Sequence, residues 1–217
     1  MTLHAARLIH LKRAVFVLAL LPLITYLWLA IHQALGANPI EALTRASGDW
    51  TLYFLCLTLA MTPLRRITKQ NWLQALRRML GLFAFFYACL HLITFIWFDH
   101  FFDTVEIWRD VWKRPFITVG FTAFLLLIPL AVTSTHAMQR RLGRHWSRLH
   151  RLVYAVALLA LLHFWWMRSG KQNFGEPLLL TTIILILLTA RVASATQRWI
   201  RRRENPQDLF ALESIVG

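Results

Sequence analysis

The hydrophobic residues of this chain gather into six long runs, separated by short stretches that are rich in Arg and Lys. A helix needs about 20 mainly apolar residues to cross the hydrocarbon core of a membrane. Because a chain in lipid must pair its own backbone polar groups, each run is predicted to form a helix. The predicted spans are residues 14–31, 50–64, 79–98, 116–135, 149–167 and 177–195.

Two of these runs need a separate argument. The second run is short, but Asp49 is the only charged residue between Ser47 and Pro63, so we keep it as a span. The first run follows Lys12 and Arg13, as the apolar part of a signal peptide would. It is longer than is usual for a signal peptide, and further apolar runs follow it. An uncleaved first helix is therefore predicted.

The composition supports a membrane protein. Hydrophobic residues make up 58% of the 217 residues and charged residues only 16%, whereas about a quarter of the residues of a soluble domain are charged. Once the six runs are removed, too little chain remains for a separate soluble domain. The expected fold is all-α: one polytopic domain over residues 1–217, with a six-transmembrane-helix bundle and a tail at 196–217.

The distribution of positive charge predicts the orientation. The net charge is +14, but the Lys and Arg residues fall between the apolar runs, which does not favour a nucleic-acid surface. If the spans alternate in direction, 18 of the 24 basic residues lie on the side of the N-terminus. Cytoplasmic loops carry such an excess. Both termini, including the tail, are therefore predicted to lie in the cytoplasm.

The cysteines and the common nucleotide motifs limit the redox chemistry. Cys56 and Cys89 both lie in apolar runs, and the chain has no CxxCH motif for covalent haem attachment. Any haem is therefore predicted to be b-type. The chain also has no GxGxxG, P-loop or HExxH motif. Hydride transfer from a nicotinamide dinucleotide by this chain alone is not expected.

Two histidines inside predicted spans are the main candidates for a functional site. An ionisable side chain within a membrane helix is costly, and a neutral imidazole is a common axial ligand of haem iron. From the helical rise, His91 lies roughly 18 Å and His163 roughly 21 Å from the inner end of its span. The matched depths predict that both histidines bind one haem iron in the outer half of the membrane. The alternative is that both only form hydrogen bonds between helices.

His150 is a third candidate, at the inner edge of the fifth span. It lies about 20 Å below the deeper histidine of that span. At this depth the third span offers Arg77 and Arg78 and no histidine. An inner haem would therefore take one protein ligand, or a second ligand from a loop residue such as His145 or His136. The alternative is an interfacial histidine in a basic loop.

Four arginines near the inner edge could bind an anionic part of a cofactor, such as a flavin phosphate or haem propionates. The predicted orientation alone also explains their positions. These residues are Arg77, Arg78, Arg144 and Arg148.

The outer connection between the third and fourth spans, residues 99–115, differs from the other loops. It combines acidic residues with tryptophan, which favours the membrane interface. A short amphipathic helix at the interface is predicted, and a docking surface for an outer partner is a compatible interpretation. The residues concerned are Asp99, Asp103, Glu106 and Asp110, with Trp108 and Trp112.

Six helices, with one histidine in the third and two in the fifth, resemble the ferric-reductase-like transmembrane domain that is shared with NADPH oxidases and metalloreductases. Three stretches carry the likeness: SGDWTLYFLCLTLAMTPLRR, RRMLGLFAFFYACLHLITF and GRHWSRLHRLVYAVALLALLHFWW. Within that family they are similar to the haem-binding membrane subunit of the bacterial periplasmic methionine sulfoxide reductase system. The resemblance covers nearly the whole chain.

This resemblance implies a multi-pass electron-transfer subunit of the bacterial inner membrane, with His91, His150 and His163 as ligands of one or two b haems. FMN is also associated with the family. Electrons from quinol or a flavin donor would pass to a periplasmic molybdopterin subunit that repairs oxidised methionine. The chain departs from the two-haem oxidase pattern because its third span lacks an inner histidine, which leaves the number of haems open.

Other functions are compatible with parts of the sequence. The main alternative is a stand-alone ferric or cupric reductase on the same scaffold. A transporter that relays protons through its histidines is less well supported, because the spans lack acidic residues and Gly/Pro interruptions. A non-catalytic assembly subunit is a further alternative.

Overall fold

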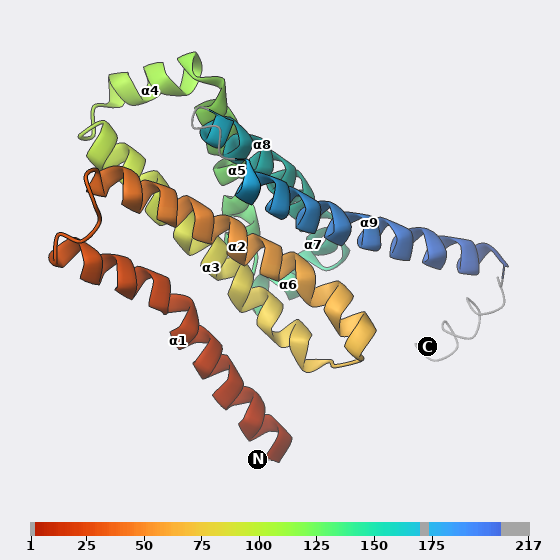
Figure 1. The fold of residues 1–217 in the computed structure, drawn as a ribbon. Coiled ribbons are helices and arrows are strands. Elements are labelled where there is room, and N and C mark those ends of the chain that lie inside the picture. Colours follow the sequence, from red (N-terminus) through yellow and green to blue (C-terminus); the bar gives the residue numbers. More distant parts are fainter. Residues whose placement is uncertain (1–2, 170–173, 205–217) are drawn as a thin grey trace.

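The computed structural model describes residues 3–169 and 174–204, and within these ranges the chain is helical without a strand. This confirms the predicted all-α fold. The helices are shown in Figure 1. They are α1 (Leu3–Ile31), α2 (Pro39–Thr68), α3 (Trp72–Thr94), the π-helical continuation η1 (Phe95–Asp99), α4 (Thr104–Lys113), α5 (Pro115–Val132), α6 (His136–Leu142), α7 (Arg144–Leu149), α8 (Leu152–Ser169) and α9 (Gly175–Glu204).

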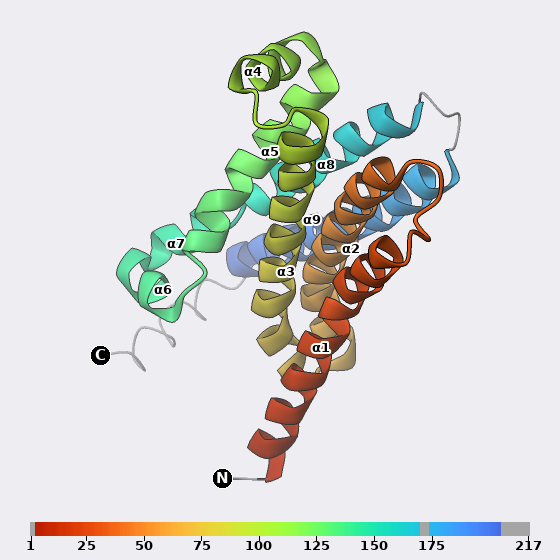
Figure 2. The same ribbon diagram turned by 90° about the vertical axis from the view of Figure 1, so that its left-hand side faces the viewer.

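Two helical hairpins form the centre of the bundle. The most extensive helix pairings are those of α2 with α3 and of α5 with α8. Contacts between α3 and α5 join the hairpins, and α9 packs on both α2 and α8. In both ribbon views α1 lies at the outside of the bundle, beside α2 and α3 (Figures 1 and 2). Leu59, Ala84, Val156 and Ile184 are fully buried in the core between these helices.

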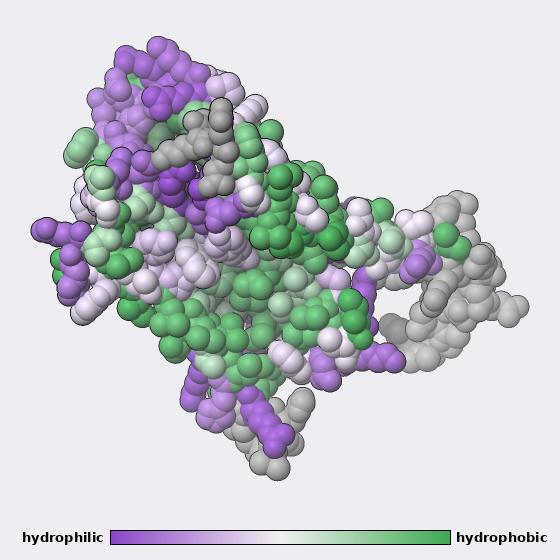
Figure 3. Space-filling model, viewed as in Figure 1, coloured by the Kyte–Doolittle hydropathy of each residue, from purple (hydrophilic) through white to green (hydrophobic). Residues whose placement is uncertain are grey.

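The outer faces of the bundle are apolar, as the lipid-facing surface of a membrane protein requires. Large exposed side chains include Trp28 of α1 and Ile186 of α9. Figure 3 shows hydrophobic side chains across the middle of one face and hydrophilic side chains gathered at the end that carries α4. Within the described chain five helical segments are long and apolar enough to cross a membrane. They are Arg7–Ile31, Trp72–Asp99, Pro115–Val132, Arg144–Ser169 and Gly175–Gln197.

The predicted span 50–64 lies within α2, which is not one of those five segments. With 30 residues α2 is long enough to cross the membrane, but Asp49 and two arginines, Arg65 and Arg66, lie close to the apolar stretch. Leu52, Leu55 and Leu59 of this stretch are nevertheless buried in the centre of the bundle. The six-span count and the orientation remain predictions that this arrangement is compatible with.

The helix ends follow local capping chemistry and shift some predicted boundaries. The Asn38 side chain accepts a hydrogen bond from the Glu41 backbone N–H (3.1 Å) and caps α2. The Asp103 carboxylate caps α4 in the same way, and α4 confirms the helix predicted in the outer loop. Helix α5 ends at Val132, three residues before the predicted limit. The predicted tail begins within α9, and residues 205–217 lie outside the described chain.

Candidate functional site

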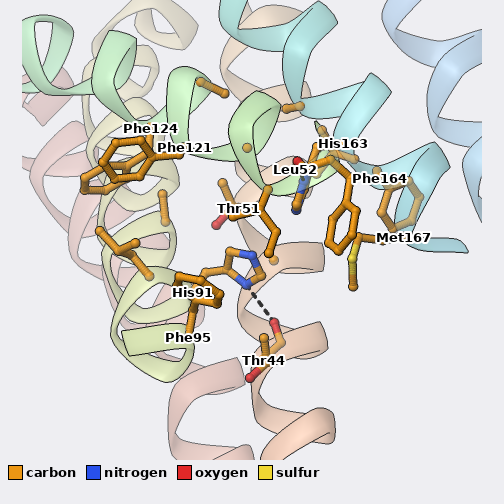
Figure 4. A pocket seen from close by; sticks show the side chains of 18 of the residues that line it. Thr44, Thr51, Leu52, His91, Phe95, Phe121, Phe124, His163, Phe164 and Met167 are labelled. Carbon is orange, nitrogen blue, oxygen red and sulfur yellow. Dashed lines mark hydrogen bonds between the residues drawn. The ribbon is translucent and has the colours of Figure 1, made fainter. Parts of the chain in front are cut away.

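A cavity of about 590 Å³ opens between the two central hairpins, near the end of the bundle that carries α4. Figure 4 shows side chains from several helices converging on it. A volume of this size is typical of a site for a cofactor or another small molecule. Its deeper wall is apolar and includes Leu52, Leu55, Ala84, Leu127, Val156 and Ala160.

His91 lies in the wall of this cavity on α3. Its Nδ1 atom is 2.8 Å from the backbone carbonyl oxygen of Thr44 on α2. Because a carbonyl oxygen can only accept a hydrogen bond, Nδ1 carries the proton and donates it. Nε2 of the neutral ring is then left with a lone pair that can bind a metal.

His163 of α8 is held in the same way from the other hairpin. Its Nδ1–H donates to the carbonyl oxygen of Phe116 on α5, at 2.7 Å. A histidine that binds a metal typically donates its second ring N–H to a carbonyl or carboxylate oxygen, which sets the ring orientation and raises its basicity as a ligand. Both histidines have this arrangement.

The two imidazoles face the same space (Figure 4). Their ring centroids are 6.0 Å apart, with an angle of 76° between the ring planes. If both Nε2 atoms bound one metal ion, each bond would be about 2 Å long. Adding the distance from Nε2 to the centre of each ring gives a centroid separation similar to the observed one. The structure therefore brings His91 and His163 together, and their role as ligands of one iron remains a prediction.

Two glycines allow the histidines to lie directly against the neighbouring helices. A Cβ atom at Gly48 of α2 would be 3.1 Å from Cε1 and 3.2 Å from Nδ1 of His91. A Cβ atom at Gly120 of α5 would be only 2.7 Å from Nδ1 and 2.9 Å from Cε1 of His163. A side chain at Gly120 would therefore displace the His163 ring.

The two half-sites repeat the same local design. In each half-site, one helix supplies the carbonyl that accepts the hydrogen bond and, one turn later, the glycine. The histidine lies on another helix, 47 residues after the residue with that carbonyl. Each member of the second set follows its counterpart by 72 residues, which is longer than the 20–50-residue periods of common repeats. The first set is Thr44, Gly48 and His91, and the second is Phe116, Gly120 and His163.

The outer mouth of the cavity is charged. Arg168 donates to Asp49 (3.1 Å) and forms an ion pair with Glu176 (2.7 Å), which links α8 to α2 and α9. Nε2 of His100 lies 3.3 Å from the carboxylate of Asp110 on α4, which is also paired with the nearby Arg114 at 3.4 Å. The charged residues in the cavity wall are Arg45, Asp49, Asp99, His100, Glu106, Asp110, Arg114 and Arg168.

His150 lies away from this cavity, at the turn between α7 and α8. Its Nε2 is 3.1 Å from Oγ1 of Thr133, and its ring stacks on Trp146 with centroids 4.0 Å apart. Arg77 is close enough to interact with it electrostatically. The structure therefore separates His150 from the His91–His163 pair, and its role as a ligand remains a prediction.

The four arginines predicted to bind a flavin phosphate or propionates do not line the cavity. Arg77 is half-buried near Arg191, and Arg78, Arg144 and Arg148 are exposed. Their role also remains a prediction.

Sequence reasoning missed several residues of the site. Gly48, Gly120, Arg45 and Arg168 were not identified as site residues, although all four contribute to the cavity wall. A usable signal was present for the glycines, because each precedes its histidine by the same interval in two successive pairs of helices.

Comparison with known proteins agrees with this geometry. Residues 47–161 match the family described as "Ferric reductase like transmembrane component". The matched stretch includes His91 and both glycines and ends two residues before His163. The chain therefore belongs to the class of ferric-reductase-like transmembrane components.

Curated relatives narrow the class. One from Herminiimonas arsenicoxydans is 57% identical over 208 residues and covers 94% of each chain. Another from Bordetella pertussis is 52% identical over 194 residues, or 89% of this chain and 92% of the relative. Both are named "Protein-methionine-sulfoxide reductase heme-binding subunit MsrQ". The chain belongs to this MsrQ family of multi-pass inner-membrane proteins. No solved structure matches it.

Proposed function

We propose that this protein is a haem b electron-transfer subunit in which His91 and His163 are the two axial ligands of one iron. The observation that carries this proposal is the pair of rings, 6.0 Å apart, each with Nδ1–H bound to a carbonyl and Nε2 available. Within the described chain no cluster of three or more His, Cys, Asp or Glu could hold a metal ion. Two imidazoles suit an iron whose other four ligands come from a tetrapyrrole.

The haem would supply one-electron chemistry, and the protein would position it and adjust its potential. The carbonyls of Thr44 and Phe116 make the imidazoles stronger donors, which would favour the oxidised form of a bound iron and lower its reduction potential. The apolar wall around the pair would keep water away from a bound iron. These effects suit transfer of electrons rather than binding of a substrate at the iron.

The acceptor in this proposal is a periplasmic molybdopterin subunit that reduces methionine sulfoxide in oxidised proteins. Support comes from the names of the relatives, which describe heme-binding subunits of a protein-methionine-sulfoxide reductase. The mouth of the cavity lies beneath α4, at the end that the charge distribution predicts to be periplasmic. A partner docked at α4 would therefore approach the haem closely.

Electrons would enter from membrane quinol or from a cytosolic flavin reductase, and FMN at the inner arginines is an alternative carrier. Arg77 near His150 provides positive charge for an anionic cofactor at that end. A stand-alone ferric or cupric reductase is the alternative function, since the charged cavity mouth would also admit a small metal complex.

The acidic residues of the outer loop provide a test of this proposal. Changing Asp99, Asp103 and Asp110 to Asn, and Glu106 to Gln, should leave the haem spectrum intact and slow haem reoxidation by the partner. We expect a roughly tenfold lower association rate at low salt, because charge mainly steers the encounter, with a smaller difference at high salt. Asn at position 103 can still cap α4. The measurement is stopped-flow reoxidation at two ionic strengths.

If the variant is reoxidised as fast as the wild type at both ionic strengths, this loop is not part of the docking surface. Reoxidation by a small iron chelate as fast as by the partner would favour the metal-reductase alternative.

A second test concerns His150. His150→Ala should retain the low-spin haem held by His91 and His163, because His150 lies outside their cavity. It should slow haem reduction by a cytoplasmic donor several-fold if His150 takes part in the inner electron path. The measurement is the optical spectrum together with the rate of reduction. Loss of the same spectral species in His150→Ala and His91→Ala would contradict separate inner and outer sites.

A further inference from the structure

We propose that Arg168 and Arg45 bind the two propionate carboxylates of the haem at the outer mouth of the cavity. This inference rests on the proposed function and assigns an orientation to the cofactor. The first step is the polarity of the cavity. Two turns inward from the histidines, its wall is formed by Leu55, Ala84, Leu127 and Val156, whereas charged side chains surround its mouth. A tetrapyrrole that carries two carboxylates has the same two-sided character.

Arg168 is already positioned to receive a carboxylate. Its side chain is 16% exposed, and its Nη2 atom alone makes the contacts to Asp49 and Glu176. The guanidinium also lies 5.2 Å from the centre of the Phe164 ring. Within the described ranges neither Nη1 nor Nε has a hydrogen-bond partner. Because guanidinium donors form a rigid fork, this arrangement leaves the N–H groups of two nitrogens, Nη1 and Nε, positioned for a further anion.

Arg45 has a similar arrangement on α2. Its Nε donates to Glu41 at 2.6 Å, and its two Nη atoms have no hydrogen-bond partner in the part of the chain that the structure describes. Arg45 directly follows Thr44, whose carbonyl holds His91. Asp49 interacts electrostatically with both Arg168 and Arg45, so the two cations lie near the same part of the mouth.

Two further observations favour this pair. The Thr44 hydroxyl is buried and has no hydrogen-bond partner among the described residues. A buried polar group of this kind requires an explanation, and a carboxylate beside Arg45 would accept its hydrogen. Arg114, the third cation of the mouth, is 57% exposed, so water screens it more strongly. Arg168 and Arg45 therefore offer one cation for each propionate.

The test pairs a change in the protein with a change in the ligand. The full chain in detergent is titrated with protohaem and with its dimethyl ester, whose carboxylates are uncharged. The wild type should bind the ester at least tenfold more weakly, because charge-assisted hydrogen bonds are lost. Arg168→Gln should bind protohaem about tenfold more weakly and discriminate much less between the two ligands. Arg109→Gln, on the exposed face of α4, is the matched control and should behave as wild type.

A second readout does not depend on affinity. Removing a positive charge beside the haem favours the oxidised iron, so Arg168→Gln should have a lower midpoint potential than wild type. Arg168→Lys should keep most of the potential, since it keeps the charge, and Arg109→Gln should not change it. If Arg168→Gln distinguishes haem from its ester as strongly as wild type does, Arg168 does not bind a propionate. Failure of the wild type to form a low-spin complex with either ligand would instead refute the proposed function.

Discussion

His163→Ala and His91→Ala are each expected to abolish the low-spin, six-coordinate haem spectrum. Each variant removes one of the two proposed axial ligands from the cavity, whose deeper wall is apolar. The remaining histidine can hold at most a five-coordinate, high-spin haem, and the haem content should fall several-fold. The measurement combines haem quantification per chain with electron paramagnetic resonance of the oxidised protein.

His32→Ala is the matched control for these two variants. His32 follows α1, and its ring is bound to the Trp28 carbonyl at 2.9 Å, outside the cavity. It should retain the spectrum and the haem content of wild type. Added imidazole should restore a low-spin signal in His163→Ala, because the deleted ring leaves space for it. Normal haem content and spectrum in both ligand variants would exclude the assignment of this pair.

Gly120→Ala is expected to have the next largest effect. The added Cβ would lie 2.7 Å from Nδ1 of His163, so the ring must move and its hydrogen bond to the Phe116 carbonyl must lengthen or break. We expect a several-fold loss of haem and an altered low-spin signal. Gly48→Ala should have a smaller effect, because its Cβ would be 3.1 Å from the nearest atom of His91.

Gly81→Ala provides the control, because its Cβ would make an ordinary 3.5 Å contact with Thr58. All three substitutions replace a helical glycine by alanine, which favours the helix by about 1 kcal/mol. Loss of haem in Gly120→Ala alone could therefore not be explained by a weakened helix. Equal haem content in the variants of Gly120 and Gly81 would contradict the close-packing argument.

The sequence was sufficient to predict the all-α fold and to single out His91 and His163, which the structure places side by side. Apolar runs of membrane length specify helices, because no other local structure satisfies the backbone in lipid. His91 and His163 could be matched because helical rise converts residue number into depth. The boundaries of α5 and α8 were less accurate, since turn contacts such as those of Thr133 with His150 and Trp146 determine them.

The charged mouth of the cavity could not be predicted in this way. Arg45 and Arg168 are far apart in the sequence, and the positive-inside rule only counted them as outer charges. Their proximity depends on how α2 and α8 pack. The absence of an inner histidine pair, in contrast, could be read from the sequence. The residue that lies 72 positions before His150, and so corresponds to it in the first half-site, is Arg78 on α3. The two half-sites are therefore equivalent at the outer level and different at the inner level.

The division of the site between two hairpins has a consequence for biogenesis. The ribosome delivers α2 and α3 before α5 and α8, so His91 enters the membrane while its counterpart is still unmade. A half-site with one imidazole cannot hold a six-coordinate iron. In the proposed assignment, stable capture of the cofactor therefore waits until the second hairpin has been inserted and has docked on the first. Haem that binds both hairpins stabilises only the assembled bundle. In this assignment a low-spin haem thus becomes a check on complete membrane insertion, because chains that stop after the first hairpin cannot form the six-coordinate complex.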